Sequence, residues 1–446
     1  MKWASIHNVY FIGIGGIGMS ALARYSRARS VNVAGCDRMK TALTEQLESA
    51  GCAIHYKDDV SQIPRRFAVS NTLVVITPAI PPTHAEWGYF RDNGFIILKR
   101  AQLLARIAEN TTCLAVAGTH GKTTASTLLG YLLDQAGVGA TSFLGGIAEN
   151  YQSNLILNTG DITVVEADEY DRSFLQLHPT IACVTSVDAD HLDVYRTDSG
   201  VQRAFSAFAS KVDPSRLVIR KGLPFAGLTY SALEAADYQA QNIRIHERGY
   251  RFDLKTPSQV ASDWIWPLPG MYNLENALAA LAMADVLGVD PKELRAFVKN
   301  FKGVKRRFSI HYDDGQVVYI DDYAHHPREI DSFLSAVRTR YPDKEITGVF
   351  QPHLFSRTRD FIDDFARALS CLDRLLLLDI YAAREAPIEG ISAARLLDKV
   401  QIGDKRITTK KDLLNELKHI HFEVLLTMGA GDIGTLAEPI KRQLTR

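Results

Sequence analysis

A strand, a glycine-containing turn and a helix follow one another between residues 113 and 135, and this order constrains the fold more than any other feature of the sequence. The apolar run 113–117 predicts a short buried strand, and residues 125–135 predict a helix with leucines along one side. The segment between them contains G-T-H-G-K-T-T. A strand, a glycine loop and a helix N-terminus together typically bind phosphate, because backbone N–H groups point towards the anion. We therefore expect an α/β protein with a phosphate site at this loop.

Two side chains of the loop have the chemistry that a nucleoside triphosphate requires. Lys122 is suited to neutralise the β- and γ-phosphates, and the Thr123 hydroxyl is suited to hold Mg²⁺. The loop is shorter than the usual G-x-x-x-x-G-K-[ST] pattern, since Val116 stands where that pattern has its first glycine. The alternative is an incidental lysine in a glycine turn, which the flanking strand and helix disfavour. The predicted ATP-binding residues of the loop are Gly118, Thr119, His120, Gly121, Lys122, Thr123 and Thr124.

Length and charge limit the classes of protein to which this chain can belong. A chain of 446 residues is too long for one core, so two or three domains are expected. With 51 basic and 51 acidic side chains the formal net charge is +0, which argues against a general affinity for nucleic acid or anionic membranes. The five cysteines form no C-x-x-C pair, and no apolar run approaches the ~18 residues of a membrane helix. We expect a cytoplasmic monomer or homodimer with small-molecule substrates and no membrane insertion.

A second glycine loop stands near the N-terminus. Residues 8–12 predict a strand, 13–18 fit G-x-G-x-x-G, and 19–29 predict a helix. Asp37 follows the next strand, 19 positions after Gly18. This β-α-β order predicts a diphosphate site, but it does not distinguish NAD from a UDP-sugar, and glycines that serve only helix–strand packing are the alternative. The predicted strand 73–77 leads into a proline-rich run. Thr77, Pro78, Ala79 and Ile80 are predicted to form a wall of this site or else a proline-rich turn.

Carboxylates follow two further predicted strands of the central segment. Strand 162–165 is followed by E-A-D-E-Y-D at 166–171, and strand 181–186 by D-A-D-H-L-D at 188–193. Because the ends of parallel strands meet at one edge of a sheet, Glu166 and His191 are predicted to join Thr123 in a two-metal arrangement. A solvated acidic turn is the alternative.

Two further predictions concern the central segment. Residues 144–146 are predicted to form a turn, and Asn273 or Asn276 is predicted either to contact an adenine edge or to cap a helix.

The last third of the chain also predicts a parallel α/β domain. Strand 317–320 leads into D-D-Y-A-H-H-P, strand 346–350 into Q-P-H, and further strands cover 375–379 and 424–428. Asp, His and Arg side chains at these strand ends suit a carboxylate and an amine. For Arg357 and Arg359 the alternative is a salt-bridged surface.

These motifs together resemble the Mur ligase family over nearly the whole length of the chain. The resemblance rests on G-I-G-G-I-G-M-S at 13–20, G-T-H-G-K-T-T at 118–124, E-A-D-E-Y-D at 166–171, D-H-L-D at 190–193, R-R-F at 306–308, D-D-Y-A-H-H-P at 321–327, Q-P-H at 351–353 and D-I-Y-A-A-R-E at 379–385. It implies a Rossmann-like UDP-substrate domain at 1–109. It also implies a central P-loop ATPase with a parallel sheet at 110–303, and a Rossmann-like domain at 304–446 that closes over ATP and admits the amino acid.

The resemblance also implies roles for individual residues. Thr123 and Glu166 would hold one Mg²⁺ and His191 a second, while Arg307, Asp379, Asn273 and Asn276 would contact ATP. The implied catalytic residues are Lys122, His191, His325, His326, His353 and Arg357. The implied UDP-substrate residues are Gly13, Gly15, Gly16, Gly18, Met19, Ser20, Asp37, Thr77, Pro78, Ala79, Ile80 and Ser173.

The reaction that the resemblance implies is ATP-dependent ligation of L-alanine to the lactyl carboxylate of UDP-N-acetylmuramate through an acyl phosphate, in peptidoglycan precursor synthesis. ADP and phosphate would be released. One alternative within the family is a recycling ligase that attaches a preformed tripeptide. Alternatives of other classes are a dinucleotide-dependent redox enzyme and a nucleotide-binding sensor without turnover.

Overall fold

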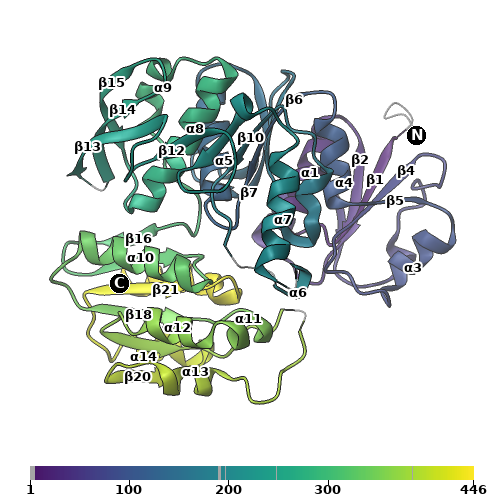
Figure 1. Cartoon of the computed structure of the whole chain (residues 1–446). Coiled ribbons are helices and arrows are strands. Elements are labelled where there is room, and N and C mark those ends of the chain that lie inside the picture. Colours follow the sequence, from purple (N-terminus) through teal and green to yellow (C-terminus); the bar gives the residue numbers. More distant parts are fainter. Residues whose placement is uncertain (1–5, 189–191, 196, 248, 384, 446) are drawn as a thin grey trace. The chain divides into compact units, whose positions relative to one another are not determined.

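The computed structural model describes residues 6–188, 192–195, 197–247, 249–383 and 385–445, and its strands form three sheets (Figure 1). The chain divides into two compact units. The first unit comprises residues 1–242, 252–264 and 275–302, and the second comprises 243–251, 265–274 and 303–446. The predicted α/β class with parallel sheets is confirmed. The residues at which we expect the three domains to begin and end stay a prediction.

The first sheet has five parallel strands in the order β3-β2-β1-β4-β5. Its strands are β1 (Asn8–Ile12), β2 (Asn32–Cys36), β3 (Ala53–His55), β4 (Thr72–Ile76) and β5 (Ile96–Lys99). Its helices are α1 (Ile17–Ala28), α2 (Ala42–Ser49), α3 (Ala85–Asp92) and α4 (Arg100–Ala108). Every residue of β1 is buried, because helices cover both faces: Val9 and Phe11 face the core of α1 and α4, and Tyr10 and Ile12 that of α3.

The second sheet has ten strands in the order β15-β14-β13-β12-β11-β10-β6-β9-β7-β8. Its strands are β6 (Thr112–Ala117), β7 (Ala140–Ala148), β8 (Ser153–Ile156), β9 (Ile162–Glu166), β10 (Ile181–Val184), β11 (Leu217–Arg220), β12 (Leu228–Ser231), β13 (Tyr238–His246), β14 (Gly249–Lys255) and β15 (Val260–Trp266). The accompanying helices are α5 (Lys122–Gln135), α6 (Leu192–Tyr195), α7 (Asp198–Ala209), α8 (Met271–Leu287) and α9 (Pro291–Val298). β6 lies between β9 and β10 and is parallel to both, so the loop after β6 lies at the carboxyl edge of the sheet.

The predicted turn at 144–146 is wrong, because these residues lie inside β7. The pairing of β7 with β8 shifts register between Phe143 and Ala148. A Cβ atom on Gly145 would lie 2.1 Å from Glu166 Oε2. The glycine therefore allows a carboxylate to approach an irregular strand, which a sequence pattern cannot distinguish from a turn.

The third sheet has six strands in the order β16-β17-β21-β18-β19-β20, and all neighbours are parallel except β16 and β17. Its strands are β16 (Ser309–Asp313), β17 (Val318–Asp322), β18 (Ile346–Phe350), β19 (Arg374–Leu377), β20 (Asp404–Ile407) and β21 (Val424–Met428). Its helices are α10 (Pro327–Arg340), α11 (Phe355–Asp360), α12 (Ile362–Leu369), α13 (Ala393–Lys399), α14 (Lys410–Glu416) and α15 (Ala437–Leu444). α10, α12 and α13 share one core with the sheet, and α14 and α15 share the other.

The strand expected at 317–320 continues to Asp322. Asp321 and Asp322 are therefore buried inside β17, whereas the sequence predicted that they follow the strand. Both carboxylates are hydrogen-bonded there, which lets the strand continue through two acidic residues.

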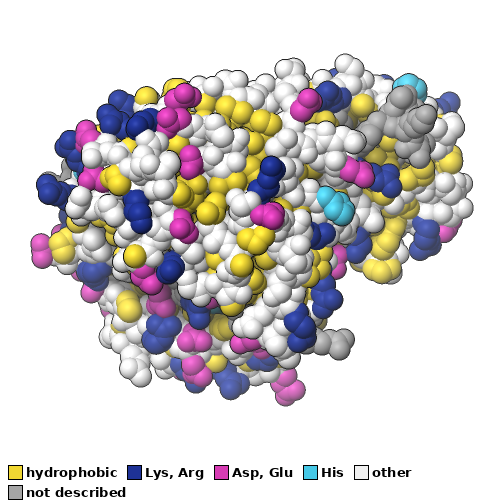
Figure 2. All heavy atoms as spheres, turned by 45° about the horizontal axis from the view of Figure 1, so that its top comes forward, with side chains coloured by type: hydrophobic (Ala, Val, Ile, Leu, Met, Phe, Trp, Pro, Cys, Tyr) yellow, Lys and Arg dark blue, Asp and Glu magenta, His cyan; other side chains and the backbone are white. Residues whose placement is uncertain are grey.

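The surface view agrees with the balanced composition. Basic and acidic side chains are interspersed over the face drawn in Figure 2. Among the described residues, no helix has the length and hydropathy that crossing a membrane requires.

Gly35→Ala is expected to lower the free energy of unfolding by about 1–3 kcal/mol, the usual cost of overpacking a core. Gly35 lies in β2, where a Cβ atom would stand 2.3 Å from the carbonyl oxygen of Phe11 in the neighbouring strand β1. Urea-induced unfolding measures the change. Gly88→Ala in α3 is the matched control, because no atom lies within 4 Å of its Cβ position and Ala favours the helix. A Gly35→Ala protein as stable as the wild type would contradict the packing described for β1 and β2.

Candidate active site

The loop between β6 and α5 has a shape that only glycine accommodates at two positions. Gly118 has a φ of +141° and Gly121 a φ of +85°. A Cβ atom on Gly118 would lie 2.0 Å from Thr185 Oγ1, and one on Gly121 would lie 2.3 Å from Asn276 Oδ1. The loop is thus packed between the segment that follows β10 and the first turns of α8.

Side chains after β10 hold the loop in place. Ser186 Oγ lies 2.9 Å from Thr119 Oγ1 and accepts a hydrogen bond from the His120 N–H at 2.8 Å. Thr185 Oγ1 donates to the carbonyl oxygen of His120 at 2.5 Å, and the Asp188 N–H donates to Thr119 Oγ1 at 3.1 Å. The loop is therefore shaped in advance by residues more than 60 positions away. The strand expected over 181–186 ends at Val184, so Thr185 and Ser186 follow it, and the sequence analysis assigned no role to either residue.

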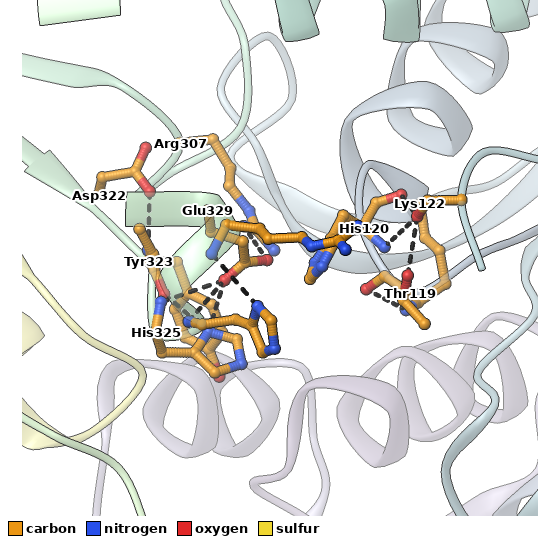
Figure 3. A network of polar contacts seen from close by, with 12 residues as sticks. Thr119, His120, Lys122, Arg307, Asp322, Tyr323, His325 and Glu329 are labelled. Atoms are coloured by element: carbon orange, nitrogen blue, oxygen red, sulfur yellow. Dashed lines mark hydrogen bonds and ion pairs between the residues drawn. The ribbon is translucent and has the colours of Figure 1, made fainter. Parts of the chain in front are cut away.

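Lys122 begins α5 and lies beside Thr119 and His120 of the loop, as Figure 3 shows. Its Nζ donates to the carbonyl oxygen of Gly118 at 2.6 Å and forms an ion pair with Glu169 Oε2 at 2.7 Å. Their side chains are only 12% and 2% exposed. Burial by itself would lower the pKa of Lys122, but the carboxylates of Glu169, Glu166 and Asp168 together raise it above its ordinary value. The ammonium is consequently charged at neutral pH.

Glu169 is the acidic partner of this ion pair, and the sequence analysis did not single it out within the motif at 166–171. Burial raises the pKa of Glu169 to about 7, although Lys122 opposes the shift. An anion bound beside Lys122 would neutralise its positive charge in place of Glu169. The pair is therefore suited to a site that alternates between an empty state and a phosphate-bound state.

The two predicted metal ligands that the structure describes follow neighbouring strands, Glu166 at the end of β9 and Thr123 in the helix after the β6 loop. Glu166 ends β9, pairs in register with Val116 of β6, and accepts a hydrogen bond from the Gly145 N–H at 3.1 Å. Thr123 lies in the first turn of α5. His191, the predicted ligand of a second ion, lies outside the described residues. Among the described residues, no group of three or more His, Cys, Asp or Glu side chains forms a metal cluster.

The first glycine loop is in contact with several residues predicted to accompany it. Gly13 has a φ of +85°, and a Cβ atom there would lie 3.0 Å from Thr77 Cγ2 and 3.4 Å from Ile80 Cδ1. The Gly15 N–H donates to Asp37 Oδ2 at 2.8 Å. Arg100, which the sequence analysis did not select, lies against Gly18.

Other residues predicted for this site have different surroundings. Met19 is buried, and the buried Ser20 hydroxyl accepts a hydrogen bond from Asn154 Nδ2 at 2.8 Å. Pro78 and Ala79 are exposed, and Ser173 is half-buried in the 3₁₀ segment η3 (Tyr170–Gln176).

In the second unit, Glu329 organises the histidines at the start of α10 (Figure 3). Its Oε2 accepts hydrogen bonds from the N–H groups of His325 and His326 at 3.1 and 3.3 Å, and lies 3.2 Å from His325 Nδ1. Its Oε1 lies 3.9 Å from Arg307 Nη1. The Arg307 guanidinium also lies over the Tyr323 ring, 5.1 Å from its centroid. Glu329 was not predicted, although its position three residues after His326 fits a capping box.

The predicted catalytic histidines differ in their surroundings. His326 is buried against Phe361 and caps α10 through Nδ1, which accepts the Arg328 N–H at 3.3 Å. The His325 ring lies 6.1 Å from that of His353, which in turn stacks on Tyr381 at 5.7 Å.

The remaining predicted site residues are distributed over both units. Arg357 is buried in α11, and Asp379 is exposed two residues beyond β19. Asn273 is buried, and its Nδ2 donates to the carbonyl oxygen of Pro269 at 2.7 Å, whereas Asn276 lies against Gly121.

Asp322 binds backbone N–H groups that come before and after β17 in the sequence. Its two carboxylate oxygens accept the N–H groups of Phe308 and Ala324, each at 2.7 Å. Burial raises the pKa of Asp322 to about 6, with Arg307 and the two N–H groups opposing the shift. The Asp322 carboxyl group therefore stays protonated in the folded chain at pH values where it is already ionised in the unfolded chain.

Asp322→Asn is expected to change how stability depends on pH. Because the folded-state pKa is raised, the stabilising contribution of Asp322 is complete below about pH 4 and is lost as pH rises towards 6, by up to about 1.4 kcal/mol per pH unit. The difference in free energy of unfolding between wild type and variant should fall from pH 4.5 to 6 and stay constant above 7. Asp314→Asn is the control, because Asp314 is exposed and its pKa is lowered. A difference that did not vary with pH would contradict this prediction.

Three family models match successive parts of the chain. Residues 8–112 match the Mur ligase family catalytic domain, residues 116–284 the Mur ligase middle domain, and residues 306–431 the Mur ligase glutamate ligase domain. Among curated relatives, the UDP-N-acetylmuramate–L-alanine ligase of Flavobacterium psychrophilum is 52% identical over 445 residues, covering 100% of this chain and 99% of that protein. The enzyme of the same name from Cytophaga hutchinsonii is 42% identical over 454 residues, covering 99% and 97%.

Solved structures resemble the chain over its whole length. The UDP-N-acetylmuramate-alanine ligase of Thermotoga maritima superposes with a TM-score of 0.84 at 25% identity and covers 98% of this chain and 99% of its own. A murein peptide ligase from Psychrobacter arcticus has the same fold, with a TM-score of 0.73 at 23% identity and 98% of each chain covered. The three matching models and the full-length relatives show that this chain belongs to the Mur ligase family.

Proposed function

We propose that this chain joins L-alanine to the lactyl carboxylate of UDP-N-acetylmuramate and converts ATP to ADP and phosphate. The observation that carries the proposal is the 52% identity, over the full length, to a relative named for this pair of substrates. The enclosed Lys122 beside a glycine loop supports an ATP-dependent reaction. The product is a precursor of peptidoglycan.

We assign the UDP part of the substrate to the glycine loop at 13–18, within residues 1–109. ATP is assigned to the loop at 118–124 and to Asn276, within residues 110–303, with Asn273, Arg307 and Asp379 as further contacts. The amino acid is assigned to residues 304–446. The residues proposed for its side of the site are His325, His326, His353 and Arg357.

The reaction has two steps. An oxygen of the lactyl carboxylate attacks the γ-phosphorus of ATP, the bond to the β–γ bridging oxygen breaks, and ADP leaves behind an acyl phosphate. The amine of L-alanine then attacks the acyl carbon, phosphate leaves with the bonding electrons, and the amine loses a proton. Phosphoryl transfer depends on positioning and charge neutralisation more than on covalent help, so Lys122 and the N–H groups of its loop supply what the first step requires.

The residues around Lys122 fit a magnesium ion. The Thr123 hydroxyl and the Glu166 carboxylate are oxygen donors, which Mg²⁺ prefers, and both border the loop. We propose that they hold one ion and that His191 holds a second. When bound, the ions neutralise the charge of two anions that must approach one another.

Lys122→Met is expected to abolish phosphate release while UDP-N-acetylmuramate still binds, because the substitution removes the cation from the phosphate loop and leaves the first glycine loop intact. Phosphate release and calorimetric binding of the UDP-substrate are the measurements. Normal phosphate release would contradict the assignment of ATP to this loop.

Folding needs its own control, because the single substitution leaves Glu169 buried without its cation, at a cost of about 3–5 kcal/mol. The double variant Lys122→Met/Glu169→Gln removes the unpaired charge. It should regain stability without regaining activity.

The substrate assignment is tested by phosphate release from ATP, Mg²⁺ and UDP-N-acetylmuramate with L-alanine, with a preformed tripeptide or with no amine. Release only with L-alanine is expected. Release only with the tripeptide would identify the chain as a recycling ligase instead. Nucleotide binding without release under any of the three conditions would identify a sensor without turnover.

A further inference from the structure

Two consecutive basic residues connect the first sheet with the acidic segment that follows β9. Lys99 ends β5 and Arg100 begins α4. Arg100 Nη2 forms an ion pair with Asp168 Oδ2 at 2.9 Å, and Lys99 Nζ forms one with Asp171 Oδ2 at 2.8 Å. The two carboxylates belong to the same short segment as Glu166 and Glu169, which border Lys122. Lys99 and Arg100 therefore bind the acidic segment whose glutamates lie beside Lys122 of the ATP loop.

Arg100 also contacts the first glycine loop, through a different nitrogen. A Cβ atom on Gly18 would lie 2.8 Å from Arg100 Nη1 and 2.9 Å from its Cδ, whereas Nη2 donates to Asp168. Gly18 lies in the first turn of α1, and the N-cap residue of this helix is Gly16, which has no side chain to bind the first N–H groups. Helix N-termini favour anions, and the Arg100 side chain is 21% exposed at this one. One guanidinium can donate to Asp168 and to an anion at this helix N-terminus at the same time, because its five N–H donors are arranged as a rigid fork.

The acidic segment has a backbone that its contacts must hold in place. Asp171 and Arg172 are both left-handed, with φ values of 54°. Non-glycine residues remain in that conformation only where surrounding contacts determine it. The contacts here include the Lys99–Asp171 ion pair, the hydrogen bond from the Arg172 N–H to the carbonyl oxygen of Glu169 at 2.9 Å, and the Arg172 guanidinium, which lies 5.7 Å from the centroid of the Tyr195 ring. The Tyr195 hydroxyl in turn donates to the carbonyl oxygen of Glu169 at 2.6 Å.

We propose that Arg100 couples the two substrate sites: its Nη1 edge binds the diphosphate of the UDP-substrate on the first glycine loop while its Nη2 edge positions Asp168. The inference rests on the proposed function, which assigns that diphosphate to the glycine loop. Occupancy of the first site then stabilises the arrangement of Glu166 and Glu169 around Lys122. Coupling of binding free energies is reciprocal, so a bound nucleotide must strengthen UDP binding by the same factor by which UDP strengthens nucleotide binding.

The test measures the dissociation constant of UDP by calorimetry on the full chain, with and without Mg²⁺ and a non-hydrolysable ATP analogue. In the wild type, the nucleotide is expected to tighten UDP binding. Arg100→Met should weaken UDP binding about tenfold or more, since a charge-assisted hydrogen bond is lost, and should abolish the effect of the nucleotide. Arg100→Lys should regain part of the affinity but not the coupling, because an ammonium lacks the fork.

Lys99→Met is the matched control. It removes the neighbouring ion pair to the same segment, but Lys99 pairs with Asp171, whereas the atoms nearest to the Cβ position of Gly18 all belong to Arg100. It should change UDP affinity less than Arg100→Met and should keep the coupling. Equal losses in both variants would indicate a merely structural role and overturn the proposal. If Arg100→Met fails to fold, Arg100→Lys and Asp168→Asn carry the test, because each should abolish the coupling.

The outcomes separate this inference from the proposed function. Unchanged UDP affinity in Arg100→Met, or a wild type in which the nucleotide does not alter UDP binding, overturns the coupling even if L-alanine triggers phosphate release. A wild type that binds UDP in a coupled manner but releases no phosphate with L-alanine overturns the proposed reaction and leaves the coupling in place. A wild type that binds no UDP overturns both the coupling and the assignment of the diphosphate to the first glycine loop.

Discussion

The buried ion pair between Lys122 and Glu169 is the interaction on which the rest of the candidate site depends. An ammonium group removed from water loses hydration that only charged or strongly polar neighbours can replace. Here Glu169 and the carbonyl oxygen of Gly118 replace it. The position of Lys122 therefore requires the acidic segment after β9 to lie against the start of α5. The ion pairs of Lys99 and Arg100, in turn, hold that segment.

Glycine has the same physical role at three places around this ion pair. Gly118 approaches Thr185, Gly121 approaches Asn276, and Gly145 approaches Glu166, each so closely that a Cβ atom would overlap the neighbouring side chain. Removing the Cβ lets a polar side chain contact the backbone directly. The phosphate loop is thereby held by the segment after β10 and by the first turns of α8, which keeps its N–H groups in one arrangement before any anion arrives.

Carboxylates position other groups in both units. Asp37 accepts the N–H of Gly15, Asp322 ties together two backbone segments, and Glu329 orients His325 and His326. In each case a charged oxygen satisfies backbone donors in a partly or fully buried setting, where an unsatisfied donor would be costly. The proposed reaction uses anionic substrates, and such carboxylates orient the loops and histidines without having to contact those substrates.

The sequence by itself determined the local units: the strands at 8–12 and 113–117, their glycine loops, the following helices, and membership of the family. These features depend on neighbours within a few residues, so their patterns can be recognised without a structure. The roles assigned to individual site residues stay predictions. Only the tertiary structure decided that residues 144–146 continue a strand and that Asp321 and Asp322 are buried. It also decided that Ser186 and Arg100 lie against the two glycine loops and that Glu329 contacts His325 and His326. The physical reason is that each of these depends on burial or on partners outside the local pattern, and often on partners more than 60 residues away.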